Sequence, residues 1–262
     1  MIKLIASDMD GTLLNDRKEL PGDFFEVFDE LERRGIKFTV ASGRSFDAVA
    51  HLFPEEYRTR LDFICDNGAN VIHEGKQVSV TPLDRPTFEQ LIRACEDIGG
   101  LRILVCAGRG TYHLTADAEF SAEIAKYYKN HIPCDDLLSV DDVIYKLAVC
   151  DMKGTQQHAK PAIDAIFGDR LNVQVSGPIW MDVMGAGVSK GSALRALGKH
   201  LGISADDTMA FGDFYNDADM LKYAGWSFAM ENGNPDIKRM TRFLARSNNE
   251  NGVLRAIRQY AL

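Results

Sequence analysis

Two aspartates, Asp8 and Asp10, lie two residues apart directly after a short apolar run at residues 2–6. Such a run is typical of a buried β-strand, and the Gly11-Thr12 pair that follows is typical of a turn. Side chains two positions apart on an extended chain point the same way, so both carboxylates can share one pocket. Two neighbouring carboxylates repel each other unless a cation lies between them or one of them holds a proton. Either condition suits phosphoryl transfer, although the stretch taken alone is equally explained as a simple turn.

Strands and helices alternate along the first part of the chain. Apolar residues spaced like one face of a helix occur within residues 23–34, and a second helix is predicted at residues 45–52. Buried strands are predicted at residues 36–41 and 61–65. The alternation resumes after residue 189, where Ser189 is a candidate helix N-cap. This order predicts an α/β fold with a doubly wound parallel sheet, a Rossmann-like core.

The middle of the chain follows a different pattern. We expect a β-hairpin at residues 71–78, followed by a helix opened by a capping box at Thr87-Phe88-Glu89-Gln90. Helices are also expected at residues 117–129 and 155–167, among several short strands. This mixture predicts an inserted α+β domain.

Residues suited to linkers mark the limits of this insertion. Pro82 precedes it, and Gly185-Ala186-Gly187 follows it. The predicted division is a core made of residues 1–82 and 185–262, with an inserted domain of residues 83–184.

Four predicted strands end in polar residues, and the ends of parallel neighbouring strands meet at one edge of a sheet. These residues are Asp8 and Asp10, Ser42, Asn67, and Asp213 with Asn216 and Asp217. Lys190 opens a helix directly after the insertion and can reach the same edge. Together they provide a carboxylate nucleophile, a second acid, oxygen ligands for magnesium, a hydroxyl and an ammonium group. Each residue alone has a structural explanation, so the prediction depends on their joint occurrence in this order.

The chain resembles the haloacid dehalogenase-like hydrolases, because four short motifs of that superfamily occur in order. They are Asp8-Met9-Asp10-Gly11-Thr12-Leu13, Ser42 in Ala41-Ser42-Gly43-Arg44, Lys190 in Ser189-Lys190-Gly191, and Gly212-Asp213-Phe214-Tyr215-Asn216-Asp217. The long insertion between the second and third motifs resembles the cap of the Cof-type sugar-phosphate phosphatases. One departure is Glu231-Asn232-Gly233, where many relatives carry Gly-Asn-Ala. The resemblance covers essentially the whole chain.

The resemblance implies a phosphatase of small phosphomonoesters, with sugar phosphates as the expected substrates. Asp8 would attack phosphorus and form an aspartyl-phosphate. Asp10 would protonate the leaving oxygen and then take a proton from water, so we expect its neighbours to raise its pKa. Mg²⁺ would be held by Asp8, by the backbone carbonyl of Asp10 and by Asp213.

Contacts to the phosphate and supporting positions are also implied. The phosphate would be held by the side chains of Ser42, Lys190 and Asn216 and by the backbone N–H groups of Met9 and Gly43, and Arg44 is a candidate substrate contact. Thr12 and Asp217 would hold the groups that contact metal and phosphate.

Composition limits the partners. The 262 residues carry a net charge of −8 without a long basic run, which argues against nucleic-acid binding. No apolar stretch approaches the length of a membrane span, and the N-terminus lacks a signal-peptide pattern. The five cysteines include no C-x-x-C pair, so a reducing cytoplasm is expected. Oligomeric state is not indicated.

The sequence is compatible with other functions. Within the same fold, the chain could be a phosphomutase or a phosphatase of another phosphomonoester. A different class would be a catalytically silent module that senses a sugar phosphate; the complete set of Asp8, Asp10, Lys190 and Asp213 argues against it.

Overall fold

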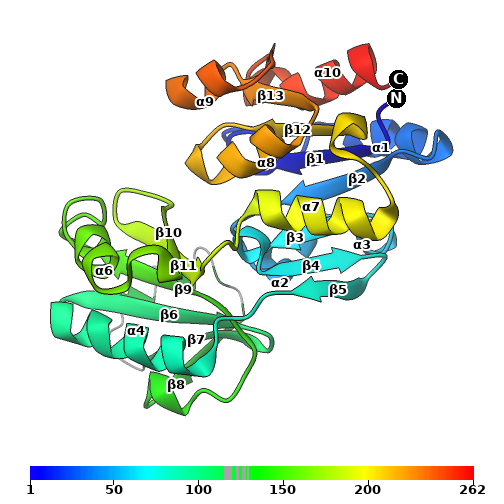
Figure 1. The fold of residues 1–262 in the computed structure, drawn as a ribbon. Coiled ribbons are helices and arrows are strands. Elements are labelled where there is room, and N and C mark those ends of the chain that lie inside the picture. Colours follow the sequence, from blue (N-terminus) through cyan, green and yellow to red (C-terminus); the bar gives the residue numbers. More distant parts are fainter. Residues whose placement is uncertain (115–119, 122–123, 126–127, 129) are drawn as a thin grey trace. The chain divides into compact units, whose positions relative to one another are not determined.

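The computed structural model describes residues 1–114, 120–121, 124–125, 128 and 130–262. The chain divides into two compact units (Figure 1). The first unit contains Met1–Ser79 and Ser189–Leu262, and the second contains Val80–Val188. The assignment of a catalytic core to the first and a cap to the second stays a prediction. Among the described helices, none has both the length and the apolar character that crossing a membrane requires.

The first unit is built on an eight-stranded sheet of order β14-β13-β12-β1-β2-β3-β4-β5. Its strands are β1 (Leu4–Asp8), β2 (Lys37–Ala41), β3 (Asp62–Cys65), β4 (Asn70–His73), β5 (Lys76–Val80), β12 (Thr208–Gly212), β13 (Trp226–Met230) and β14 (Phe243–Ala245). The strands from β14 to β3 are parallel, whereas β4 pairs with β3 in the antiparallel direction. The predicted α/β class with a largely parallel sheet is therefore confirmed.

Helices cover both faces of this sheet (Figure 1). They are α1 (Phe24–Arg33), α2 (Phe46–Ala50), α3 (Glu55–Arg58), α7 (Lys190–Leu201), α8 (Ala218–Tyr223), α9 (Pro235–Met240) and α10 (Gly252–Tyr260). On one face, Phe28 of α1 and Ile257 of α10 belong to the core cluster that contains Ile5 of β1. On the other, Leu194 of α7 clusters with Ala6. Because successive strand residues point to opposite faces, β1 is buried on both sides.

The described residues of the second unit form a six-stranded sheet of order β10-β11-β9-β6-β7-β8. Its elements are α4 (Arg85–Ile98), β6 (Leu101–Ala107), β7 (Gly110–Leu114), β8 (His131–Cys134), β9 (Ile144–Asp151), α6 (Ala159–Phe167), β10 (Leu171–Val175) and β11 (Trp180–Gly185). Phe88 of α4 and Ile163 of α6 pack with Leu147 of β9. The helix expected at residues 117–129 lies largely outside the described residues.

Two helix starts in the second unit differ from the prediction. Helix α4 begins at Arg85, because the side chain of Asp84 accepts a hydrogen bond from the N–H of Thr87. The predicted capping box at Thr87 is therefore wrong. Helix α6 begins at Ala159, whose N–H donates to the carboxylate of Asp151 at 3.0 Å. The residues before Ala159 form a turn rather than the helix predicted from residue 155.

The start of α7 matches the prediction. Ser189 is its N-cap, and Oγ of Ser189 accepts a hydrogen bond from the N–H of Ser192 at 3.0 Å. Oγ of Ser192 hydrogen-bonds in return with the N–H of Ser189. This reciprocal capping fixes where the helix begins, and therefore where its first residue, Lys190, is placed.

Candidate active site

Asp8 and Asp213 are brought together by neighbouring parallel strands. Asp8 is the last residue of β1, and Asp213 directly follows β12, which pairs with β1. Gly11 allows their loops to approach closely. Its φ is +81°, and a Cβ at this position would lie 2.5 Å from Oδ2 of Asp213. A larger residue at position 11 would therefore displace Asp213.

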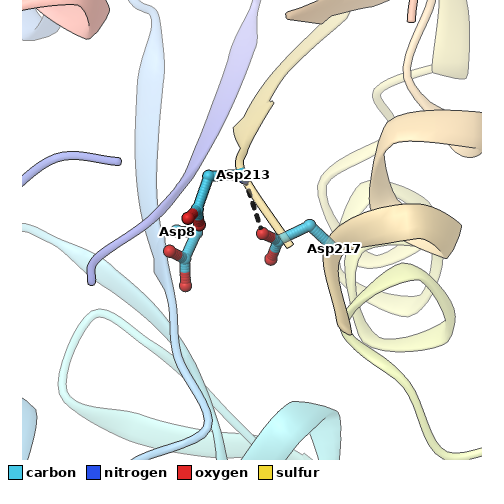
Figure 2. A group of neighbouring side chains, drawn as sticks. All are labelled: Asp8, Asp213 and Asp217. Carbon is cyan, nitrogen blue, oxygen red and sulfur yellow. Dashed lines mark hydrogen bonds between the residues drawn. The ribbon is translucent and has the colours of Figure 1, made fainter. Parts of the chain in front are cut away.

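Figure 2 shows Asp8, Asp213 and Asp217 close together at this edge of the sheet. Each offers one carboxylate oxygen, and these oxygens lie within 4.8 Å of one another. Oδ2 of Asp217 accepts hydrogen bonds from the backbone N–H groups of Asp213 at 3.0 Å and Phe214 at 3.2 Å. Asp217 thus fixes the loop that carries Asp213.

Lys190 places a cation in the same buried cluster. Its side chain is fully buried, and Nζ donates to Oδ1 of Asp8 at 2.6 Å and to Oδ1 of Asp217 at 2.7 Å. When all are ionised, the three carboxylates and one ammonium carry a formal net charge of −2. An excess of negative charge in a buried site favours the uptake of protons or of a cation.

The pKa values of the cluster reflect this imbalance. Burial raises the pKa of Asp8 well above its usual range, with the charges of Asp217 and Asp213 adding to the effect and Lys190 opposing it. Burial and the charge of Asp217 raise the pKa of Asp213 to about 6. Burial lowers the pKa of Lys190, but the charges of Asp217 and Asp8 outweigh it, so the net shift is upward. The ammonium of Lys190 therefore stays charged, and the carboxylates of Asp8 and Asp213 bind a proton or a cation more readily than ordinary aspartates.

The donor set fits a hard divalent cation. Among the described residues, no hydrogen bond reaches Oδ2 of Asp8 or Oδ2 of Asp213, whereas both oxygens of Asp217 are engaged. Carboxylate oxygens are the ligands that Mg²⁺ prefers, and a divalent ion would cancel the excess charge. Asp8 and Asp213 are therefore the better ligand candidates, with Asp217 holding their surroundings.

Asp10 has a different environment. Its Oδ1 accepts hydrogen bonds from Nη2 of Arg44 at 2.6 Å and from Nζ of Lys18 at 2.8 Å. Burial raises the pKa of Asp10, but these two cations outweigh it and the net shift is downward. The expectation that the neighbours of Asp10 raise its pKa is therefore wrong for the structure without substrate. Lys18 was not among the predicted site residues. The sequence signal for it is a basic residue in the turn that follows the first motif.

The remaining predicted phosphate contacts lie on adjoining loops. Oγ of Ser42, which is buried, accepts a hydrogen bond from the backbone N–H of Arg44 at 3.1 Å. A Cβ on Gly43 would lie 3.0 Å from Oδ1 of Asn67, so these two loops pack tightly. Nδ2 of Asn216 donates to the same oxygen at 3.4 Å. The structure thus links the loops after β2, β3 and β12, while the phosphate contacts themselves stay predictions.

Thr12 and Met9 take supporting positions. Oγ1 of Thr12 donates to Oδ1 of Asp213 at 3.2 Å, so Thr12 helps to orient that carboxylate. The side chain of Met9 is fully buried in the core of the first unit. Only its backbone is therefore available for the predicted phosphate contact.

Two asparagines for which no role was predicted hold the loop after Asp10. Nδ2 of Asn232 donates to the carbonyl of Gly11 at 2.8 Å. Oδ1 of Asn232 accepts a hydrogen bond from the N–H of Asn248 at 3.0 Å, and Nδ2 of Asn248 donates to the carbonyl of Leu14 at 3.0 Å. These contacts join the two ends of the chain, so they depend on long-range folding.

Comparisons with known proteins agree on the family. A family model described as haloacid dehalogenase-like hydrolase matches residues 5–257. The 5-amino-6-(5-phospho-D-ribitylamino)uracil phosphatase YbjI of Escherichia coli is 31% identical, over 98% of this chain and 95% of that protein. The crystal structure of SMU.1108c from Streptococcus mutans matches with a TM-score of 0.91 at 28% identity, over 99% of each chain.

A more distant structure has the same fold. The subclass IIB sugar phosphatase BT4131 matches with a TM-score of 0.82 over 98% of each chain, at 19% identity. These matches run over nearly the whole sequence, the insertion included. The chain belongs to the haloacid dehalogenase-like hydrolases, of the Cof type.

Proposed function

We propose that this chain is a magnesium-dependent phosphatase that hydrolyses small phosphomonoesters, above all sugar phosphates, through an aspartyl-phosphate on Asp8. The observation that carries the proposal is the buried Lys190, whose Nζ contacts both Asp8 and Asp217. This ammonium fixes the carboxylate that would attack phosphorus and keeps it beside a positive charge. The phosphatase name of the relative from Escherichia coli supports the reaction type.

The reaction divides into two displacements. In the first, a carboxylate oxygen of Asp8 forms a bond to phosphorus as the bond to the leaving oxygen breaks, and Asp10 gives that oxygen a proton. In the second, water attacks phosphorus, gives a proton to Asp10 and releases Asp8. Before substrate binds, Arg44 and Lys18 favour ionised Asp10. A phosphate dianion opposes them, because a nearby negative charge favours the protonated carboxyl group.

Magnesium would be held by Asp8, by Asp213 and by the backbone carbonyl of Asp10. When bound, it supplies positive charge that offsets the repulsion between Asp8 and the phosphate and stabilises the transferring group. Thr12 and Asp217 keep the Asp213 loop in place. Ser42, Gly43 and Asn216 would contact the phosphate oxygens.

Sugar phosphates are the substrate class with the most support. The relative from Escherichia coli is named for a substrate with a phosphorylated ribityl group. Residues 83–184 would form the cap that selects the substrate. A cytoplasmic location, and the lack of nucleic-acid and membrane partners, stay predictions from composition.

Phosphate release from a panel of phosphorylated hexoses, pentoses and nucleotides tests the proposal. With Mg²⁺, we expect turnover by the wild-type protein and a loss of at least about 10³-fold in Asp8→Asn, because the amide cannot act as the nucleophile. The circular dichroism spectrum of the variant should match that of the wild type. Substantial residual hydrolysis by Asp8→Asn would exclude Asp8 as the nucleophile.

The same panel separates the alternatives. Movement of phosphate within a substrate without release would indicate a phosphomutase. Phosphate release only from phosphomonoesters other than sugar phosphates would indicate a phosphatase of another substrate class. Stoichiometric binding without turnover would indicate a sensor. Chelation of divalent ions should stop phosphate release, and added Mg²⁺ should restore it; an undiminished rate in chelator would leave Asp213 with a structural role only.

A further inference from the structure

Two cations contact a single oxygen of Asp10. Nζ of Lys18 lies 2.8 Å and Nη2 of Arg44 lies 2.6 Å from Oδ1 of Asp10. No described residue donates a hydrogen bond to the other oxygen, Oδ2. Two donors on one oxygen restrict the rotation of the carboxyl group and leave the second oxygen available.

The turn that carries Lys18 has a defined backbone conformation. Lys18 has a φ of +63°, in the left-handed region that non-glycine residues rarely adopt. Its N–H donates to the carbonyl of Asn15 at 2.9 Å. Oδ1 of Asn15 accepts hydrogen bonds from the N–H groups of Arg17 at 2.9 Å and Glu19 at 3.0 Å. The turn is therefore closed by its own hydrogen bonds.

Contacts with the C-terminal part of the chain fix the turn in space. The carboxylate of Asp16 accepts hydrogen bonds from Nδ2 of Asn248 at 3.0 Å and Nδ2 of Asn249 at 2.9 Å. The N–H of Asp16 donates to Oδ1 of Asn249 at 3.1 Å. The side chain of Lys18 is 57% exposed, and an exposed ion pair on a free loop would be worth little. Here the backbone of Lys18 is held in place, so less entropy is lost when its ammonium meets Asp10.

We propose that Lys18 is a positioning residue for proton transfer by Asp10, an inference that rests on the proposed phosphatase function. Lys18 and Arg44 hold Oδ1, so that Oδ2 carries the proton. The O–H bond at Oδ2 breaks as the proton moves to the leaving oxygen and the bond from that oxygen to phosphorus breaks. In the second displacement a proton of the attacking water returns to Oδ2. Without Lys18, the acid is still present but less well oriented.

The dependence on leaving group tests this role. A sugar alkoxide needs a proton to leave, whereas 4-nitrophenolate leaves without one. The parameter to compare is kcat/KM, because it covers the steps up to departure of the leaving group. For Lys18→Met we expect kcat/KM to fall by about ten- to a hundredfold on the best sugar phosphate of the panel, and by less than about threefold on 4-nitrophenyl phosphate.

Arg17→Met is a matched control in the same turn. The side chain of Arg17 is 80% exposed, and its guanidinium contacts Glu19 instead of Asp10. This variant also removes one positive charge from the turn, but it removes no contact with Asp10. It should therefore keep the wild-type kcat/KM on both substrates. Lys18→Arg should recover most of the lost activity on the sugar phosphate. Thermal midpoints of all three variants show whether the turn remains folded.

The outcomes separate this inference from the proposed function. Equal losses on the two substrates in Lys18→Met, or the same selectivity change in Arg17→Met, would overturn the role of Lys18. Failure of the wild-type protein to hydrolyse either substrate would overturn the proposed function instead.

Discussion

At the residue scale, Lys190 shows how strongly one buried charge can matter. Lys190→Met leaves Asp8 and Asp217 without their shared cation, so we expect the free energy of unfolding to fall by about 3–5 kcal/mol near neutral pH. Uptake of a proton by Asp8 limits this loss at low pH. Because that proton is released as pH rises, the difference from wild type should be larger at pH 8 than at pH 5. Urea denaturation at both pH values measures it.

Lys3→Met is the control for this prediction. Nζ of Lys3 lies 3.0 Å from Asp207, but the side chain of Lys3 is largely exposed. The loss of an exposed pair should cost less than about 1 kcal/mol at either pH. Equal losses in the two variants would mean that Lys190 contributes no more than a surface lysine.

The residue types of the site and the pairing of Lys190 with Asp8 and Asp217 could be predicted, but the contacts made by the surrounding loops could not. Asp8, Asp10 and Asp213 were predicted to meet because each follows a buried strand, and parallel strands end at the same edge of a sheet. The contacts of Lys18 and Asn232 depend on the path of loops through space. Whether Asp10 faces cations or carboxylates is decided by those loops, and the prediction for its pKa was wrong for that reason.

At the element scale, Gly68 couples two parts of the site. It closes the 3₁₀ turn η1 (Asp66–Gly68) after β3 with a φ of +104°, and a Cβ there would lie 2.2 Å from the carbonyl oxygen of Ser189. Gly68→Ala must therefore separate this turn from the start of α7. We expect a loss of about 2–4 kcal/mol in stability, from backbone strain and overpacking together, and a lower rate of phosphate release.

Gly35→Ala separates backbone strain from steric contact. Gly35 has a similar positive φ of +71°, but a Cβ there would meet no atom within 4 Å. Its substitution should cost about 1 kcal/mol and leave phosphate release unchanged. If urea midpoints and rates show equal effects at the two positions, the contact between Gly68 and α7 is not important.

Asp151 provides a pH-dependent contribution in the second unit. Its buried carboxylate accepts hydrogen bonds from His158 and from the N–H groups of Lys153 and Ala159. Burial raises the pKa of Asp151, but these hydrogen bonds outweigh it, so the net shift is downward. A lowered pKa means that the stabilisation is complete above about pH 4, the value of an unfolded aspartate, and is lost as pH falls below it.

Asp151→Asn tests this contribution. At pH 7 the variant should be less stable by about 1–3 kcal/mol, because the amide cannot accept all three hydrogen bonds. The difference between the variant and the wild type should shrink as the pH is lowered from 5 to below 4. The free energy of unfolding of both proteins is measured at several pH values. A difference that does not change with pH would show that the charge of Asp151 is not involved.

Long, periodic elements could be predicted from the sequence, and short ones could not. The strands at β1, β2 and β3 and the helix at α1 have clear apolar patterns and match the structure. By contrast, β14 has three residues, too few to show a period. Helix α4 was predicted to start too late because Asp84 and Thr87 are both good N-caps, and only the structure shows which one is used.

At the scale of the whole molecule, the two units have separate hydrophobic cores. Clusters around Phe28 and around Leu194 belong to the first unit, and a cluster around Phe88 belongs to the second. The change of pattern along the sequence predicted an insertion because helix–strand alternation stops and later resumes. The order of strands within each sheet could not be obtained in this way, because it depends on long-range pairing such as that of β1 with β12.

Because the two units have separate cores, we expect Mg²⁺ to stabilise only the unit that binds it. Ligand binding stabilises the folded state by mass action, by about 2.7 kcal/mol at a hundred times the dissociation constant. Because Asp8 and Asp213 both belong to the first unit, Mg²⁺ should raise the calorimetric transition of that unit and leave the second unchanged. Asp151→Asn identifies the second transition, since it should lower that one alone.

The charge variant Asp213→Asn completes this test. It removes a candidate ligand, so the shift caused by Mg²⁺ should largely disappear while both transitions remain. In chelator, the variant should be more stable than wild type in the first unit, because it lacks one of the repelling carboxylates. Burial and the charge of Asp217 raise the pKa of Asp213 to about 6, which reflects that repulsion. An equal magnesium shift in both proteins would exclude Asp213 as a ligand. A shift of both transitions together would mean that the two units unfold as one.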